Sequence, residues 1–495
     1  LESFDGTLLA GCESLETLVL PEGVKRIEAG ALDDCVAIKS VTLPPVEQLE
    51  DFGLDDILET KRQALGLHYD ADGFMIWKGW LLDYEDREVS ELTVPEGETY
   101  TAAFAIGGGV KLVKKGAGTY VVGTMHLGVR SLLIEAGLVE MGNAAAFGNK
   151  MPVPVKNGAA FDMKGWSDNC IDITIEGTGP DGLGALRNTG AALGTGVYQL
   201  AGLRLSGDAL IYATGHFGLI NLNYAPTVLE LNGHTLTMNY SKGQGFWMSN
   251  TSGSSAGTFI VKQGIPYTYN KSYEVSIPNV DFIIDGADSL FRIPTADYAS
   301  KTTVGSITLL NGGKYEEGNN NGYMKNFSVL GSGEIGASNH IKWIYLADTL
   351  LVSNETATVN IYPPFTANST YPRIVKKGAG TLNILNNHTD QRFDRGLDLQ
   401  GGTVTGNLFG GGIYDRWADF DGRQVPASLS LYDGDDAFTV DCGLKMFGHT
   451  GLKNAKKSMK VLFRSRFGSE SFTHDIYGDG NDTFTSLVLR AGQDC

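Results

Sequence analysis

The chain has 495 residues, and its composition excludes several classes of protein before any motif is considered. Its 65 glycines accompany only 15 prolines and a hydrophobic fraction of 42%, which is too apolar for a disordered glycine-rich chain. The formal charge of −18 argues against nucleic-acid binding and is explained by solubility, with calcium uptake outside the cell as the alternative. Frequent short apolar runs and few amphipathic helical stretches predict a mostly β chain.

Cysteine usage and the ends of the sequence add further bounds. The five cysteines make neither a disulfide framework nor a C-x-x-C pair, and Cys12 and Cys35 are expected to be small buried residues. No apolar run approaches the roughly 18 residues that a membrane-spanning helix needs. Because Leu1 begins in the middle of a repeat, we expect a piece of a longer protein whose export signal and anchor lie outside it.

An internal repeat of 23 residues opens the chain. CESLETLVLP (12–21) returns as CVAIKSVTLP (35–44), and VSELTVPEG (89–97) is a third copy of its second half. Each unit predicts a short strand that cannot bury its apolar side chains alone, so neighbouring units must stack. These residues resemble the BspA-like leucine-rich repeats of bacterial surface proteins, which implies a leucine-rich-repeat cap over residues 1–100. Residues 45–70 depart from the pattern and predict one or two short helices.

A second, looser repeat runs through residues 101–495. LVKKGAGTYVV (112–122) returns as IVKKGAGTLNI (374–384), which aligns Lys114 with Lys376, and each copy is followed by an apolar strand and a small-residue turn. This combination resembles the autotransporter-associated β-strand repeat, whose passenger domains fold as right-handed parallel β-helices. Short alternating strands separated by Gly, Asn and Asp agree with that fold.

We therefore expect an all-β solenoid, a right-handed parallel β-helix preceded by the leucine-rich-repeat cap. At about 22 residues per coil, residues 101–495 would form about 18 coils. Leu229, Leu231, Ile260 and Leu309 are expected in an internal apolar column. SLVLRAGQDC at the end of the chain is interpreted as a further coil strand with no cap after it, so self-association is expected near Leu487–Leu489.

Two short motifs resemble sites but lack their structural context. GTGPDG (177–182) satisfies G-x-G-x-x-G, yet Pro180 and the glycines that follow predict no helix to bind a pyrophosphate. GSSAG (253–257) satisfies G-x-S-x-G, yet a polar loop leads into a strand where a nucleophile elbow requires a helix. Both motifs are interpreted as corners of the solenoid.

YGDGNDTF (477–484) resembles one unit of the calcium-binding nonapeptide repeats. Asp479, Asn481 and Asp482 are the candidate calcium ligands, because carboxylate and amide oxygens suit a hard cation. YDGDDAF (432–438) is a weaker copy of it. Calcium rolls need adjacent copies and these two are separated, so a plain Asx/Gly corner is the competing interpretation.

Two tryptophans and two groups of carboxylates are the remaining candidates. Trp77 and Trp80 lie close together in one strand-like run and are candidate ligand-binding residues, where a pair sharing a face would stack on a sugar. Packing at the junction between cap and β-helix is the alternative. The acidic groups at 55–56 and at 433–436 suit a polysaccharide lyase or glycoside hydrolase, yet no strand shows the required combination of acids with Lys, Arg or His.

The sequence thus shows no readable active site. It predicts a non-enzymatic bacterial cell-surface or secreted scaffold, or an adhesin-like passenger that binds glycans or neighbouring surface proteins and no nucleic acid. The alternative is a carbohydrate-active β-helix enzyme. No cofactor is expected other than calcium, and the location is expected to be extracellular.

Overall fold

The computed structural model describes a large part of the chain in separate ranges. These are residues 3–4, 7–27, 30–42, 51–52, 73–77, 80–84, 91–94, 99–102, 109–123, 129–144, 146–147, 151–167, 171–194, 199–220, 225–268, 274–293, 301–318, 321–337, 344–363, 365–366, 372–385, 397–406, 424–433, 436–447, 458–474, 480 and 482–489. They divide into two compact units, Leu1–Ala191 and Ala192–Cys495. Within these ranges no helix is long and apolar enough to cross a bilayer.

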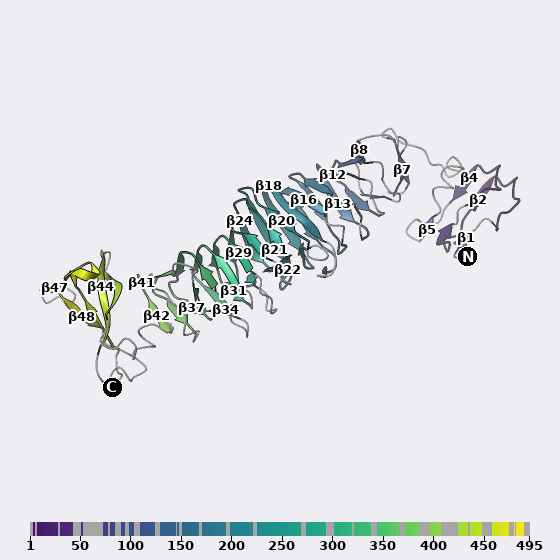
Figure 1. Cartoon of the computed structure of the whole chain (residues 1–495). Coiled ribbons are helices and arrows are strands. Elements are labelled where there is room, and N and C mark those ends of the chain that lie inside the picture. The colour runs from purple at the N-terminus through teal and green to yellow at the C-terminus, as the bar shows by residue number, and fades with distance from the viewer. Residues whose placement is uncertain are drawn as a thin grey trace. The chain divides into compact units, whose positions relative to one another are not determined.

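In the residues described, the chain is a parallel β-solenoid of about 11 turns with almost no helix, which confirms the predicted fold class (Figure 1). The right-handed sense of the coil remains a prediction, in line with the hand of parallel crossovers in general. The short helices predicted at 45–70 lie outside the described residues, apart from the strand β5 (Asp51–Phe52).

The 23-residue repeat near the N-terminus stacks as the sequence predicts. β2 (Thr17–Val19) pairs in parallel with β4 (Ser40–Thr42), so that Leu18 lies opposite Val41, its counterpart in the aligned repeat. β1 (Ser3–Phe4), β3 (Arg26–Ile27) and β5 form a second parallel stack. Cys35 is fully buried in the small core and Cys12 packs against it half-buried.

Two parallel ladders continue the first unit. One contains β8 (Glu91–Val94), β10 (Lys111–Lys114), β12 (Ser131–Ile134), β14 (Pro152–Val155) and β16 (Ile171–Gly177). The other contains β9 (Thr99–Ala102), β11 (Thr119–Val122), β13 (Gly137–Met141), β15 (Ala159–Asp162) and β17 (Leu186–Asn188). Because Glu91 pairs with Lys111, the third copy of the short repeat belongs to the first coil of these ladders, ahead of the boundary predicted at residue 100.

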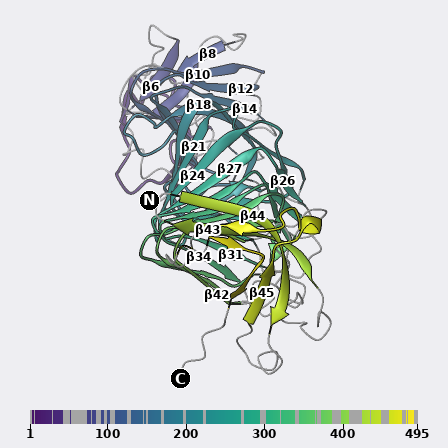
Figure 2. The ribbon, with the colours of Figure 1, turned by 90° about the vertical axis from the view of Figure 1, so that its left-hand side faces the viewer.

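Three parallel ladders form the solenoid of the second unit (Figure 2). The first is β20 (Thr227–Glu230), β23 (Thr251–Ser252), β26 (Val275–Ile277), β29 (Lys301–Val304), β32 (Asn321–Met324), β35 (Ile344–Leu346) and β38 (Phe365–Thr366). The second is β21 (Thr235–Tyr240), β24 (Gly257–Gln263), β27 (Val280–Asp285), β30 (Ile307–Leu310), β33 (Phe327–Leu330), β36 (Thr349–Ser353), β39 (Arg373–Lys377) and β41 (Leu397–Leu399).

The third ladder is β19 (Phe217–Leu219), β22 (Gly245–Met248), β25 (Ile265–Thr268), β28 (Leu290–Arg292), β31 (Gly313–Glu317), β34 (Gly333–Ala337), β37 (Thr358–Ile361), β40 (Thr381–Ile384) and β42 (Thr403–Gly406). The long strand β18 (Leu200–Ala213) pairs with both β20 and β21, so it serves the first two ladders at once. One strand per ladder and per coil gives the second unit three sheet faces around one interior.

The interior is filled by every second residue of most strands. Leu229, Leu231 and Leu309 are fully buried, which confirms their predicted place in the core. The prediction is wrong for Ile260, which is only half-buried. In the alternating strand β24 its neighbours Phe259 and Val261 occupy the inward positions, so Ile260 necessarily lies on the opposite face.

Aromatic side chains pack on one another from coil to coil inside the second unit. Phe259 and Phe282 are register partners in β24 and β27, and their rings stack with centroids 5.1 Å apart. Further ring contacts follow in order through Phe282–Phe291, Phe291–Tyr315 and Tyr315–Phe327. Equivalent positions in successive coils thus pack on one another, as Phe259 does on Phe282 and Phe291 on Tyr315, which is expected when one coil cannot bury its own apolar face.

The coils do not continue to residue 495, which corrects the sequence prediction. β43 (Val425–Asp433), β44 (Asp436–Phe447), β45 (Ser458–Leu462) and β48 (Ser486–Leu489) form an antiparallel sheet. The SLVLRAGQDC segment therefore contributes an antiparallel strand, not a coil. The count of about 18 coils was too high partly for this reason and partly because coils are longer than 22 residues in places, as where Ala209 lies opposite Leu236.

A fully buried carboxyl lies inside the solenoid of the second unit. Glu317 of β31 is completely buried and accepts a hydrogen bond from the hydroxyl of Tyr315, while its Oε1 has no partner. Burial raises the pKa of Glu317 well above its ordinary value, against the hydrogen bonds from Tyr315 and from the backbone of Gly322. The folded chain therefore holds this carboxyl in its protonated form more readily than the unfolded chain does.

Replacing Glu317 by Gln should remove a pH-dependent loss of stability. Because the pKa of Glu317 is raised in the folded state, its stabilising contribution to the free energy of unfolding is fully present below its unfolded pKa of about 4.3. This contribution is lost as the pH rises from there through the folded-state pKa. The Glu317→Gln variant should gain free energy of unfolding over the wild type with rising pH, by up to about 1.4 kcal/mol per pH unit. Chemical denaturation at several pH values measures this, with the outward-facing Glu316→Gln as control. A difference independent of pH would contradict the assignment.

Candidate functional site

The two predicted tryptophans lie on two strands of a hairpin, not in one run. β6 (Phe74–Trp77) and β7 (Trp80–Tyr84) are antiparallel, and Trp77 is the direct register partner of Trp80. β7 also pairs in parallel with β9, which ties the hairpin to the start of the ladders. Sugar binding by this pair stays a prediction.

The predicted calcium ligands fall mostly outside the described residues. This holds for Asp479 and Asn481. Asp482 is exposed and its Oδ1 accepts a hydrogen bond of 2.9 Å from the hydroxyl of Thr483. In the weaker copy, Asp433 and Asp436 are the last register partners of an antiparallel hairpin, and Asp435 lies outside the described residues. Within the described ranges no cluster of three His, Cys, Asp or Glu side chains is placed to hold a metal ion.

The G-x-G-x-x-G segment is a loop closed by a buried arginine. Arg187 of β17 is only 3% exposed, and its guanidinium binds both carboxylate oxygens of Asp181 at 2.6 and 2.8 Å. Its Nε donates to the carbonyl of Gly184 at 2.9 Å, and the Gly184 amide returns to the carbonyl of Thr178. Burial raises the pKa of Asp181, but the hydrogen bonds and the charge of Arg187 outweigh it and lower that pKa overall. The loop therefore neutralises its own charge.

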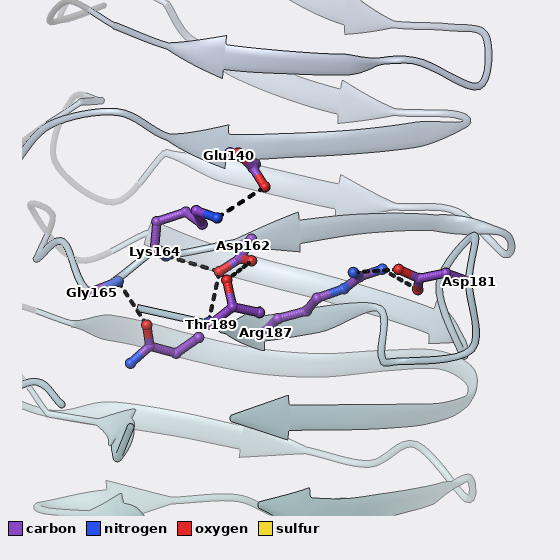
Figure 3. A network of polar contacts seen from close by, with 8 residues as sticks. Glu140, Asp162, Lys164, Gly165, Asp181, Arg187 and Thr189 are labelled. Carbon is purple, nitrogen blue, oxygen red and sulfur yellow. Dashed lines mark hydrogen bonds and ion pairs between the residues drawn. The ribbon is translucent and has the colours of Figure 1, made fainter. Parts of the chain in front are cut away.

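A buried carboxylate connects the neighbouring coils at the other end of these strands (Figure 3). Asp162 of β15 is 1% exposed, and its Oδ1 accepts hydrogen bonds from the amides of Lys164 and Thr189 at 2.9 and 3.1 Å. Its Oδ2 accepts one from the Thr189 hydroxyl at 2.6 Å. Three donors from two coils thus satisfy one carboxylate, which is the condition for burying it.

The same corner contains a buried amide. Asn188 is fully buried, its Oδ1 accepts from the Gly165 amide at 2.7 Å, and its Nδ2 donates to the carbonyl of Ala191 at 2.9 Å. Lys164 and Gly165 both have positive φ, 50° and 79°, and a Cβ at Gly165 would lie 2.4 Å from the amide nitrogen of Ala191. The tight turn therefore requires glycine here and exposes an amide that Asn188 satisfies.

The repeated K-K-G-A-G-T segment places a lysine in the interior in each copy. The ammonium of Lys114 is held by the carbonyl oxygens of Lys115, Gly116 and Ala136 at 2.5, 2.9 and 3.4 Å. That side chain is 1% exposed. Lys114 and Lys376, which the sequence aligns, are thus both buried. The first lysine of each motif serves to satisfy carbonyl groups at a corner.

The G-x-S-x-G segment is also a corner. Its serine hydroxyl, that of Ser255, accepts a hydrogen bond from the Asn232 amide at 3.0 Å. Glu230 binds the amides of Ser254 and Ser255 at 3.0 and 2.7 Å. Burial raises the pKa of Glu230, but hydrogen bonds from the hydroxyls and amides of these two serines outweigh it and lower that pKa overall. Asn232 has φ of 52°, in the left-handed region that Asn adopts more readily than most residues at a corner.

These groups join coil to coil and leave no open nucleophile with a base in the described corners. Acids pair with amides, hydroxyls or arginine of the same corner or of the next coil, and lysines pair with carbonyls. Comparison with models of known protein families finds no match, and neither curated proteins nor solved structures give a significant one. The fold is established. A family is not.

Sequence reasoning missed Asp162, Arg187 and Asn188. Asp and Asn are common in exposed turns, so nothing in their immediate neighbourhood marks them as buried. The available signal is the combination of an Asp two residues before a Lys-Gly turn with an Asn-Thr pair about one coil later, at 188–189.

Removing the Asp162 carboxylate should destabilise the first unit strongly. The Asp162→Ala variant leaves the amides of Lys164 and Thr189 and a hydroxyl without an acceptor, at a cost of about 3 kcal/mol. The control is Glu140→Ala, which removes only the partly exposed 3.3 Å ion pair with Lys164 and should cost less than about 1 kcal/mol. Urea denaturation followed by circular dichroism measures both. Equal effects would show that the buried network contributes no more than a surface pair.

Proposed function

We propose that the chain is part of a non-enzymatic bacterial cell-surface or secreted scaffold, an adhesin-like passenger that binds glycans or neighbouring surface proteins. The observation that carries the proposal is the use of buried charge. Asp162 and Lys114 bind groups of the next coil, and Arg187 closes a loop of its own coil. All three therefore hold the framework together, unlike the separated acids and bases of a catalytic site.

Two sequence resemblances support the finer assignment. The duplicated K-K-G-A-G-T corner is the element that resembles the autotransporter-associated β-strand repeat, and Lys114 and Lys376 occupy equivalent buried positions. The N-terminal 23-residue offset between Leu18 and Val41 is compatible with BspA-like leucine-rich repeats. Both families belong to bacterial surface proteins, so an extracellular location follows from the proposal.

A column of residues suited to binding lies on the outer face of the third ladder. Trp247, Tyr267 and Arg292 are successive register partners in β22, β25 and β28. All three are half-buried, and the Trp247 ring stacks on His216 at 4.5 Å. Trp, Tyr and Arg are the residue types most enriched among energetically dominant interface positions, so this column is where a ligand contact should cost most to remove.

A glycan array combined with assays for soluble products tests the proposal. The purified chain should bind surface glycans or surface proteins without releasing fragments, and Trp247→Ala should weaken binding about tenfold or more. Tyr323→Ala, on the outer face of the first ladder, is the matched aromatic control. Depolymerisation of a polysaccharide that is lost in Asp435→Ala or Asp436→Ala would instead establish the carbohydrate-active enzyme.

A further inference from the structure

The two K-K-G-A-G-T corners share one geometry although 262 positions separate their lysines, and one lies in each compact unit. The ammonium of Lys376 is held by the carbonyl oxygens of Lys377, Gly378 and Gly401 at 2.6, 2.7 and 3.4 Å. The corresponding distances around Lys114 differ from these by no more than 0.2 Å. Two carbonyls come from the turn itself and the third comes from the following coil.

A glycine of the following coil completes the enclosure of the ammonium group by these three carbonyl oxygens. Gly137 and Gly402 occupy the same place in the two copies, and both have φ of 72°. A Cβ at Gly402 would lie 2.5 Å from the Gly378 oxygen and 2.9 Å from the Lys376 ammonium. A Cβ at Gly137 would lie 2.5 Å from the Gly116 oxygen. The next coil can therefore close over the ammonium only with glycine at this position.

The chemistry of the enclosure fits a primary ammonium group. Three carbonyl oxygens require three N–H donors, and the protonated amine is the form of lysine that carries three. Burial lowers the pKa of Lys376, and the charge of Glu355 acts in the opposite direction. Backbone carbonyls lack a negative charge of their own, so the site attracts the cation through dipoles.

We propose that each K-K-G-A-G-T corner is a binding site for a primary ammonium cation, which this chain fills with its own lysine, and that the bound charge closes the corner. The inference does not depend on the proposed surface function. The second lysine of each pair is half-buried at Lys115 and exposed at Lys377. In the contacts described it contributes its backbone carbonyl to the corner, and its own ammonium group is not one of the donors.

The test is chemical rescue of a truncated lysine. Lys376→Ala removes the atoms that n-propylammonium contains, so this ion should restore the thermal midpoint that the variant loses, while leaving the wild type unchanged. n-Propanol has the same shape without the charge, and sodium chloride at equal ionic strength controls for screening. Rescue by n-propylammonium alone is the expected result. Equal rescue by n-propanol, or no rescue by either compound, would overturn the proposal.

Further variants separate charge from packing. Lys376→Met fills the space without N–H donors and should remain destabilised, whereas Lys377→Ala should match the wild type. If Lys376→Ala does not fold without an added compound, its refolding yield is measured with n-propylammonium and with n-propanol. A higher yield with n-propylammonium alone is again the expected result. Lys114→Ala provides the independent second copy. A Lys376→Met variant as stable as the wild type would show that the lysine acts by its apolar stem and would contradict the proposal.

The wild type offers a check that needs no substitution. Amine acylation followed by peptide mass spectrometry should modify Lys377 on the order of 100-fold faster than Lys376, because the buried amine reacts only when the corner opens locally. The same contrast is expected between Lys115 and Lys114. Comparable rates at Lys376 and Lys377 would mean that the ammonium is not enclosed.

Discussion

The constraint on which the structure depends is that a single coil can bury neither its apolar face nor the polar groups of its corners. Each strand presents alternate residues to the interior, and these pack on the equivalent residues of the next coil, as Phe259 packs on Phe282. Several corners also contain buried amides and carbonyls, which need hydrogen-bond partners because water does not reach them. The neighbouring coil supplies the partners, through Asp162 in one case and Lys376 in another.

The sequence was sufficient to predict the solenoid because its strongest signals are local and repeated. Alternating strands of four to seven residues and glycine-rich corners indicate stacked coils, and the duplicated lysine motif has the same geometry in both places. Alternation alone does not decide which residues of a strand lie inside, and this is why Ile260 was assigned wrongly while Leu229 was assigned correctly. The phase of a strand is set by its neighbours' packing, which no single segment contains.

The C-terminal region could not be predicted by the same reasoning. Alternating strands have a period of two in parallel and antiparallel sheets alike, so β43 and β44 look like coil strands in the sequence. The feature that distinguishes these two strands is their length of nine and twelve residues, since most coil strands of this chain are shorter. GTGPDG could be recognised as a corner, because Pro180 and the glycines after it give no helix signal, and in the structure Arg187 closes this loop.

Engineered disulfides between coils test the register most directly. Thr308 and Ser328 are register partners in β30 and β33. Strands lie about 4.8 Å apart, within the Cα separation that a disulfide accepts. Thr308→Cys with Ser328→Cys should therefore cross-link within one molecule, detected by peptide mass spectrometry. Thr308→Cys with Leu330→Cys, shifted by two residues to about 8 Å, should not. Efficient cross-linking of the shifted pair, or none in the aligned pair, would contradict the parallel solenoid.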